Sequence, residues 1–274
     1  MGHGIAKVEV ERYSGATHDP SQDSVAVEEP LEIRVSGETL AVTMRTPGHD
    51  RELALGFLWA EGILHALDEI SSIAHCVRGD DEAGRGNAIE VTPAPGARLQ
   101  LPDGELGRRG TLMSSACGVC GRRSIDDLLA RCVPVQKGGP LARRVLLQAA
   151  DQLRKAQPIF GETGGCHGAA LFSLDGALVA SFEDVGRHNA VDKLVGARLL
   201  AGRLPAREQF LLVSGRTSFE IVQKAVMAGI SIVAGISAPS SLAIEVAAAA
   251  GVTLLGFVRA DRFVAYTHQE RIID

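Results

Sequence analysis

The sequence is poor in aromatic residues and carries little excess charge. One Trp, two Tyr and eight Phe make up 4% of its 274 residues, so aliphatic side chains must supply most of the core. The formal net charge is −5 and the pI is about 5.9. Broad, non-specific nucleic-acid binding needs a basic face, which this balance does not favour. We therefore expect no nucleic-acid partner, while a small local anion site remains compatible with the composition.

Long apolar runs are also missing. The best candidate for a membrane span, residues 241–258, is interrupted by Glu245 and Gly251. The first 13 residues lack an apolar core and include Glu9 and Glu11, unlike a secretory signal peptide. We expect a cytoplasmic protein that does not enter the membrane and whose thiols stay reduced.

Cysteine is scarce, and the five residues are Cys76, Cys117, Cys120, Cys132 and Cys166. An odd number this small does not suit a disulfide scaffold, so reactive or metal-binding roles are open. Cys76 and Cys132 have apolar neighbours, which favours ordinary buried packing for both.

The beginning of the chain is predicted to be rich in strands. Residues 1–29 are polar and irregular, and we expect a frayed arm there. Apolar residues alternate in 31–35 and 40–44, on either side of a Ser-Gly turn, which predicts a hairpin with one buried face. Asp50 resembles an N-cap, and the spacing after it predicts a helix that ends near Gly62.

A charged, glycine-rich stretch at 78–86 predicts a loop, followed by short strands at 89–92 and 98–101. Residues 101–110 contain Pro, Gly and several charges, and are predicted to be an exposed connection. We accordingly divide the chain into a smaller strand-rich subdomain, 1–110, and a larger domain, 111–274.

The larger domain alternates strands and helices. Its first part has helical patterns at 124–131 and 141–155, then a strand pair at 168–173 and 177–182 around an Asp-Gly turn. The remaining elements are expected as a helix at 187–200, a strand at 210–213, a helix at 218–228, a strand at 231–236, a helix at 240–250, and strands at 253–258 and 262–267. Continuously apolar strands alternating with helices predict an α/β fold with parallel pairing and both sheet faces covered.

The pair Cys117 and Cys120 lies in the most informative stretch. Glycines separate and follow the cysteines, and Arg122 and Arg123 come just before a predicted helix. Nearby guanidinium groups and a helix N-terminus both lower the pKa of a thiol and favour the nucleophilic thiolate. The glycines allow the loop to bend, so it could move between two protein sites. This pattern favours a reactive thiol.

Three other interpretations of the pair stay open. It could supply half of a tetrahedral zinc site, with Cys166 and His167 completing the ligands. It could be a redox dithiol, although such pairs follow an early strand in a βαβ unit, which is not the context here. The cysteines could also simply pack in the core.

Two predicted strand-to-helix turns offer hydroxyl groups and free backbone N–H groups. Ser214, Gly215, Arg216 and Thr217 follow one strand, and residues 237–241 follow the next. Carboxyl ends of parallel strands share one sheet edge, and helix N-termini there bind anions. Ordinary N-capping by Thr217, Ser218 and Ser240 is the simpler interpretation of each turn alone.

A third segment, 184–193, is more polar than helix capping requires. It contains Asp184, Arg187, His188, Asn189 and Lys193, and it enters the predicted helix at 187–200. We interpret this mix as facing a ligand, with Arg187 and His188 as cofactor-binding residues. Upstream, the two glycines of residues 163–165 suggest close backbone approach to another group.

Taken in order, these motifs resemble the formate dehydrogenase accessory sulfurtransferase (FdhD) family. The matching residues are 115–121, 163–165, 184–193, 214–220 and 237–240, and the resemblance spans about 25–270. It implies a sulfur carrier that accepts a persulfide from a cysteine desulfurase and passes sulfur to the molybdenum bis-molybdopterin guanine dinucleotide cofactor. The cofactor would then enter the formate dehydrogenase apoenzyme, so this enzyme would depend on the protein.

The resemblance also implies roles for individual residues. Cys117 would carry the persulfide and Cys120 would assist. The implied cofactor-binding segment consists of Phe257, Val258, Arg259, Ala260, Asp261 and Arg262. The larger domain would be a layered α/β/α domain like that of cytidine deaminases, and the protein would be a homodimer.

Two alternatives to sulfur transfer are a non-catalytic chaperone for the cofactor and a zinc-binding protein like the deaminases. The deaminase H-x-E and P-C-x-x-C motifs are missing, which argues against deamination, and we expect no permanently bound metal. Cys166 departs from the family pattern and leaves an extra thiol or a local metal site open.

Overall fold

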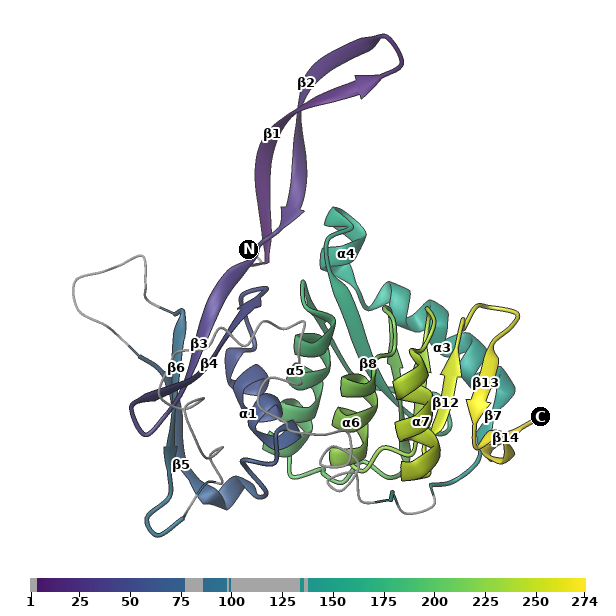
Figure 1. The fold of residues 1–274 in the computed structure, drawn as a ribbon. Helices are drawn as coiled ribbons and strands as arrows, with labels where there is room; N and C mark the ends of the chain where they lie inside the picture. The colour runs from purple at the N-terminus through teal and green to yellow at the C-terminus, as the bar shows by residue number, and fades with distance from the viewer. Residues whose placement is uncertain (1–3, 77–85, 98, 100–133, 136–137) are drawn as a thin grey trace.

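The computed structural model describes residues 4–76, 86–97, 99, 134–135 and 138–274. These residues form a six-stranded and a four-stranded sheet with helices packed between and around them, a short two-stranded pair, and a two-stranded ribbon that projects from one end (Figure 1). The predicted connection at 101–110 and the predicted helix at 124–131 lie outside the described residues, as do most of 78–86 and 98–101. The division into 1–110 and 111–274 therefore stays a prediction.

The expectation of a frayed arm at residues 1–29 is wrong. Strands β1 (Ile5–Ser14) and β2 (Thr17–Ala26) pair along their whole length as an antiparallel ribbon. The turn between them includes Gly15, whose φ of 61° suits glycine. Most of the ribbon's side chains are exposed, so no buried face gave the sequence a readable pattern.

The smaller sheet has the strand order β4-β3-β6-β5. The predicted hairpin is confirmed as β3 (Glu29–Val35) and β4 (Glu38–Arg45), and the predicted strand at 89–92 as β6 (Ala88–Pro93). Edge strand β5 (Ile70–His75) was not predicted, because its half-exposed residues lack a clear alternation.

Helix α1 (Asp50–Ala60) covers the smaller sheet through contacts of Leu53 and Ala54 with Leu31 and Ile33. The interpretation of Asp50 as its N-cap is wrong. His49, with a φ of 58°, is the N-cap, and Asp50 is the first helical residue. The Asp50 carboxylate instead binds the Arg45 guanidinium, which occupies both oxygens that could otherwise accept a capping bond from the helix backbone.

The larger sheet has six strands in the order β13-β12-β11-β10-β8-β9. Strands β10, β11 and β12 are parallel, as predicted, while the three others pair antiparallel. The bounds are β8 (His167–Ser173), β9 (Leu178–Asp184), β10 (Gln209–Val213), β11 (Ile232–Gly235), β12 (Thr253–Gly256) and β13 (Val264–Thr267).

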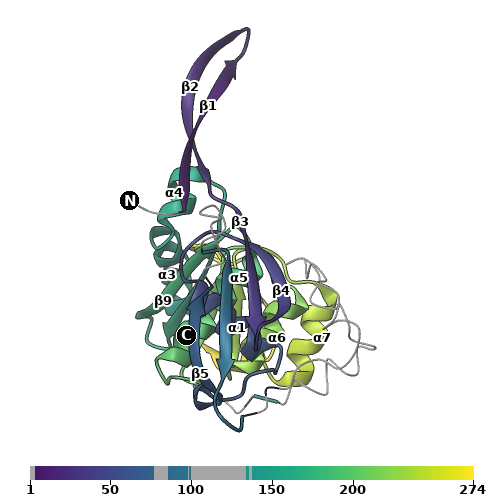
Figure 2. The same ribbon diagram turned by 90° about the vertical axis from the view of Figure 1, so that its left-hand side faces the viewer.

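Both faces of the larger sheet are buried, which confirms the α/β prediction. Along β10, Leu211 and Val213 contact the helices on one face, and Phe210 and Leu212 contact the other layer. The first face carries α5 (Arg187–Leu200), α6 (Phe219–Met227) and α7 (Ser241–Ala250), and the second carries α3 (Arg143–Lys155) (Figures 1 and 2).

Helices α1 and α5 join the two sheets through a close crossing. A Cβ atom on Gly56 would lie 1.9 Å from Asp192 O, and one on Gly196 would lie 1.9 Å from Glu52 O. The two backbones therefore touch at reciprocal glycines, and neither position has room for a side chain. This contact makes the smaller sheet and α1 a layer packed on the helices of the larger one.

Short elements complete the described chain. They are η1 (Leu67–Glu69), α4 (Pro158–Thr163), η3 (Gln269–Arg271) and the parallel pair β7 (Leu141–Ala142) and β14 (Ile272–Ile273). Among the residues that the structure describes, none of the helices is long and apolar enough to cross a bilayer.

Candidate functional site at one edge of the larger sheet

One edge of the larger sheet collects the polar segments that the sequence singled out. The carboxyl ends of β10, β11 and β12 lie there, because these strands are parallel. Strand β8 runs the other way, and its first residue His167 pairs with Asp184, the last residue of β9. Segments 163–167, 184–188, 214–218, 236–240 and 257–262 therefore share this edge.

The turns after β10 and β11 are joined directly, which confirms the predicted geometry. Thr217 N donates to Ala238 O at 3.1 Å, and Ser240 N donates to Thr217 O at 3.0 Å. Ser240 caps α7 by accepting from Ala243 N, so ordinary N-capping explains this hydroxyl. Ser218 occupies the N-cap position of α6 but makes no side-chain capping bond. Its hydroxyl is used elsewhere, as the His188 contact shows.

Arginine side chains give this edge a local positive charge, although the chain as a whole is acidic. A Cβ atom on Gly215 would lie 3.2 Å from His167 Nδ1 and 3.7 Å from Arg187 Cδ, so these side chains meet over the Gly215 backbone. Burial, followed by the charges of Arg187, His188 and Arg216, lowers the pKa of His167 below its usual value. The His167 imidazole is therefore neutral near pH 7.

His188 lies in a buried cluster at the start of α5. Its Nε2 atom is 3.2 Å from Ser218 Oγ and 3.7 Å from Glu220 Oε2. Burial would raise the pKa of Glu220, but the neighbouring His188 and Ser218 side chains outweigh it and bring the pKa to about 2. Glu220 is therefore a carboxylate that holds His188 and the start of α6 together.

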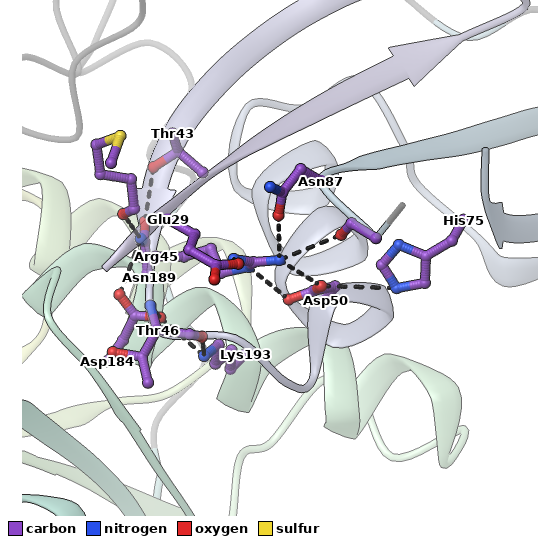
Figure 3. A network of polar contacts seen from close by, with 12 residues as sticks. Glu29, Thr43, Arg45, Thr46, Asp50, His75, Asn87, Asp184, Asn189 and Lys193 are labelled. Carbon is purple, nitrogen blue, oxygen red and sulfur yellow. Dashed lines mark hydrogen bonds and ion pairs between the residues drawn. The ribbon is translucent and has the colours of Figure 1, made fainter. Parts of the chain in front are cut away.

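Asp184 lies at the centre of a buried network that fixes the entry to α5 (Figure 3). Its Oδ2 atom accepts from Thr46 N at 3.1 Å and lies 2.8 Å from Lys193 Nζ. Its Oδ1 atom accepts from Gly186 N at 2.8 Å and from Asn189 Nδ2 at 3.0 Å. The prediction that the whole segment faces a ligand is therefore wrong for part of it. Asp184, Asn189 and Lys193 face the interior, while Arg187 and His188 reach the sheet edge.

A second network lies on the smaller sheet and was missed by the sequence analysis. Arg45 is 2% exposed and donates to both carboxylate oxygens of Asp50, at 3.0 and 3.1 Å (Figure 3). It also donates to Glu29 and Asn87. Thr46 follows Arg45 directly and joins this network to the Asp184 network. No local motif marks these residues, because the partners of Arg45 come from α1, β3 and the residue before β6.

A cavity of about 540 Å³ opens beside the same edge, on the α3 side of the sheet. Apolar side chains including Leu153, Ile236 and Val258 line it, together with Arg154 and Arg259. The Arg154 guanidinium lies 4.7 Å from the centre of the Phe160 ring. Helices α3 and α4 were not expected to form part of the site.

The segment implied as cofactor-binding forms the turn after β12, at this edge. Phe257 N donates to Ser237 O at 3.2 Å, and Val258 N donates to Gly235 O at 3.1 Å. Phe257 has a φ of 53° and is 42% exposed. Of the remaining residues, Val258, Arg259 and Ala260 line the cavity, while the side chains of Asp261 and Arg262 pair with each other near the surface.

The cysteines divide into described and undescribed residues. Cys117 and Cys120 lie outside the described residues. Cys166 is buried, its Sγ atom is 3.5 Å from Thr46 Oγ1, and burial raises the pKa of its thiol. In the described part of the chain, no three His, Cys, Asp or Glu side chains are grouped to hold a metal ion. The zinc hypothesis needs Cys117 and Cys120, so it stays open.

Phosphate-bearing ligands fit this edge in charge and in backbone geometry. Arg187, Arg216 and Arg259 supply guanidinium groups, and the N-termini of α5 and α6 point to the same edge. The Nε atom of Arg187 is buried and has no hydrogen-bond partner within the described chain. Such a donor is costly to leave unpaired, and an anion would satisfy it.

Comparison with known proteins places these features in a family context. The model of the FdhD/NarQ family matches residues 26–273. A relative from Anaeromyxobacter dehalogenans (strain 2CP-1), named sulfur carrier protein FdhD, is 51% identical over 274 residues, covering 98% of this chain and 93% of the relative. A relative of the same name from Mycobacterium tuberculosis (strain H37Rv) is 44% identical over 278 residues, covering 99% of this chain and 100% of the relative.

The fold is also found in a solved structure. A crystal structure from Desulfotalea psychrophila, provisionally described as a formate dehydrogenase accessory protein, matches with a TM-score of 0.77. The match covers 98% of this chain and 100% of the other at 24% identity. At this identity the likeness concerns the fold.

Proposed function

Because the chain belongs to the FdhD/NarQ family, we propose that it accepts sulfur as a persulfide on Cys117 and delivers it to a molybdenum bis-molybdopterin guanine dinucleotide. A cysteine desulfurase is the donor, and the sulfurated cofactor goes to a formate dehydrogenase apoenzyme. The reaction takes place in the cytoplasm, and the working form is a homodimer. The larger domain takes the layered arrangement of the cytidine deaminases.

The observation that carries this proposal is the local positive charge at one sheet edge of an acidic protein. Three strand-to-helix turns meet there. Arg187 and Arg216 lie near His167 at this edge, and Arg259 lines the cavity beside it. A guanine dinucleotide carries phosphates for the arginines and ring systems for the apolar walls. In this scheme Phe257 and Arg262, which lie in the turn after β12, contact parts of the cofactor that reach beyond the cavity.

The sulfur chemistry follows from the properties of thiolates. The Cys117 thiolate attacks the terminal sulfur of the donor persulfide, the donor S–S bond breaks, and the donor leaves as a thiolate. Attack of the Cys120 thiolate on Cys117 Sγ then forms a disulfide between the two and expels the transferred atom as hydrosulfide, which the cofactor takes up. A cellular dithiol must reduce this disulfide before the next cycle.

The test is the mass of the intact protein after incubation with cysteine and a desulfurase. We expect the wild type to gain the mass of one sulfur atom, and a reductant should remove it. Cys117→Ala should gain none and should fail to activate formate dehydrogenase in a cell that lacks the wild-type protein. Cys166→Ala is the matched control and should load normally, because burial keeps the Cys166 thiol protonated.

Two results would contradict the proposal in different ways. Full activation of formate dehydrogenase by Cys117→Ala would favour a chaperone that delivers the cofactor without sulfur chemistry. One tightly held zinc ion per chain, lost in Cys117→Ala or Cys120→Ala, would favour a zinc protein instead.

A further inference from the structure

The ribbon β1–β2 is bound to the body of the protein at its base. Lys7 Nζ lies 3.0 Å from Glu162 Oε1 on α4, and Ser24 Oγ donates to the same oxygen at 2.9 Å. In the part of the chain that the structure describes, the ion pairs of residues 8–23 stay within the ribbon. The ribbon therefore stands clear of the body over most of its length (Figures 1 and 2).

Such a ribbon lacks the support that a hairpin normally needs. A two-stranded hairpin alone is marginally stable in water, and packing of its apolar face against a further element stabilises it. Val8 and Val25 are diagonal neighbours on one face of the ribbon and are 37% and 39% exposed. Asp19, nearer the tip, belongs to the same face. This face is available to another chain.

The projecting residues are acidic. With His neutral, the charged side chains of residues 8–23 are four carboxylates and one guanidinium, a formal charge of −3: Glu9, Glu11, Asp19, Asp23 and Arg12. Arg12 pairs with Asp23, so Asp19 on the same face has no ion-pair partner in the described chain. Two ribbons laid against each other would repel. The surface that receives the ribbon should therefore be basic.

The outward face of α3 has this opposite charge. Its exposed charged side chains are four basic groups and one acidic group: Arg143, Arg144, Arg154, Lys155 and Asp151. Asp274 pairs with Arg143 and Asp151 with Lys155, which leaves Arg144 and Arg154 without a carboxylate partner among the described residues. The helix is about 20 Å long and residues 8–14 span about 23 Å, so the ribbon can lie along it.

One chain cannot bring these two surfaces together, but two copies can. The ribbon leaves α4 away from the body, whereas α3 runs from α4 back along the body (Figures 1 and 2). A two-fold axis beside α4 reverses these directions and lays the ribbon of one copy along α3 of the other. The tip then reaches the first turn of α3, so Asp19 comes to Arg144.

We propose that two copies of this chain exchange ribbons about such an axis, each packing its Val8, Val25 and Asp19 face along the partner's α3. Residues 8–23 and the exposed residues of α3 together reach the roughly 20–30 residues a side of a stable interface. A ribbon bound alone to an unrelated protein does not. Arg154 also lines the cavity, so each ribbon borders the site of the other copy. This inference rests on the homodimer of the proposed function and gives it an interface.

Sedimentation equilibrium of the full chain at several concentrations tests the exchange. We expect the wild type to dimerise, and Asp19→Lys and Arg144→Glu each to raise the Kd about ten-fold, because like charges then meet twice across the axis. The double variant Asp19→Lys/Arg144→Glu should regain most of the wild-type affinity, since opposite charges meet again. Val8→Asp should weaken the dimer by placing a carboxylate on the apolar face.

Glu38→Lys is the matched control. It makes the same charge change as Asp19→Lys at an exposed position of β4, outside the ribbon, and should dimerise as the wild type does. Circular dichroism of each variant establishes that the body is folded before sedimentation.

Three results would overturn the inference. A wild type that stays monomeric would leave the ribbon to a different protein, an unchanged Kd for Asp19→Lys and Val8→Asp would place the interface elsewhere, and a double variant no tighter than the single ones would exclude α3 as the receiving surface. Sulfur loading by the desulfurase, measured on the same samples, separates the two proposals. A monomeric wild type that loads sulfur would refute the ribbon exchange alone, and a ribbon-dependent dimer that loads none would refute the sulfur carrier alone.

Discussion

At the scale of single residues, the buried Asp and Lys side chains beside the sheet edge lie in pairs and networks. Lys193 is 1% exposed and pairs with the fully buried Asp184, and Lys224 pairs with Asp192 at 2.7 Å. Removing one member of such a pair typically costs about 3–5 kcal/mol, because the other charge stays buried without compensation. These pairs join α5 to Thr46 and to α6, so they hold the loops of the sheet edge in place.

Glu220 contributes to the stability of the folded state, and its low pKa sets how this contribution changes with pH. Its folded-state pKa of about 2 lies below the ordinary value of 4.5. It therefore stabilises the folded state above pH 4.5, and this contribution is lost as the pH falls from 4.5 towards 2. Its size is on the order of 3 kcal/mol, since one pKa unit corresponds to about 1.4 kcal/mol.

Denaturant unfolding of Glu220→Gln and wild type at several pH values measures this contribution. The difference in free energy of unfolding should be largest near pH 6 and should shrink steadily below pH 4.5. Glu245→Gln, on the exposed side of α7, serves as control and should show no such trend. A difference that is independent of pH would show that Glu220 is not the anion described above.

At the scale of elements, α1 and α5 cross with their backbones in direct contact. Alanine is preferred over glycine inside a helix by about 1 kcal/mol, so local propensity alone favours replacing Gly196. The structure opposes this, because the new Cβ atom would lie 1.9 Å from Glu52 O in the facing helix. Backbone atoms cannot yield as a flexible side chain can, and the helices would have to separate.

Gly196→Ala should therefore lower the free energy of unfolding, by roughly 1–3 kcal/mol as for other overpacked cores. Gly161→Ala in α4 is the matched control, because a Cβ atom there meets nothing within 4 Å. That change should be neutral or stabilise the protein by up to about 1 kcal/mol. Urea unfolding of both variants measures whether each change raises or lowers the free energy of unfolding. A Gly196→Ala protein as stable as the wild type would contradict the observed crossing.

At the scale of the whole molecule, one tryptophan reports on the contact between the two layers. Trp59 is the single Trp of the sequence, and its Nε1 atom donates to Met227 O, from α1 to α6, at 2.8 Å. The two layers also share the buried Thr46–Asp184–Lys193 network. Because each layer buries polar groups that only the other satisfies, neither is expected to remain folded alone.

Urea unfolding should accordingly show one transition when followed by Trp fluorescence and by far-ultraviolet circular dichroism. Coincident midpoints are the expected result for a cooperative unit. A fluorescence change that clearly precedes the loss of secondary structure would show that the smaller sheet and α1 separate first. Lys193→Met should shift both curves together to lower urea concentration.

Much of the fold could be predicted from periodicity, and the errors have physical causes. Strands β10, β11 and β12 were readable because both of their faces are buried, which leaves apolar runs between helical patterns. The ribbon β1–β2 was missed because backbone pairing sustains it while most of its side chains face solvent. Asp50 was misassigned because its partner Arg45 lies on another element.

The sequence by itself determined the order of the elements, the reactive-thiol hypothesis for Cys117 and the turns at Ser214 and Ser237, because each depends on neighbouring residues. Only the tertiary structure decided that Asp184 and Lys193 face inward while Arg187 reaches the sheet edge, and that Thr46 and Glu220 belong beside them. The physical reason is that burying a polar or charged group costs free energy, and this cost is offset by the hydrogen-bond or ion-pair partner that lies next to it in the folded structure. For these residues the partners come from strands and helices far away in the chain, where no local pattern records them.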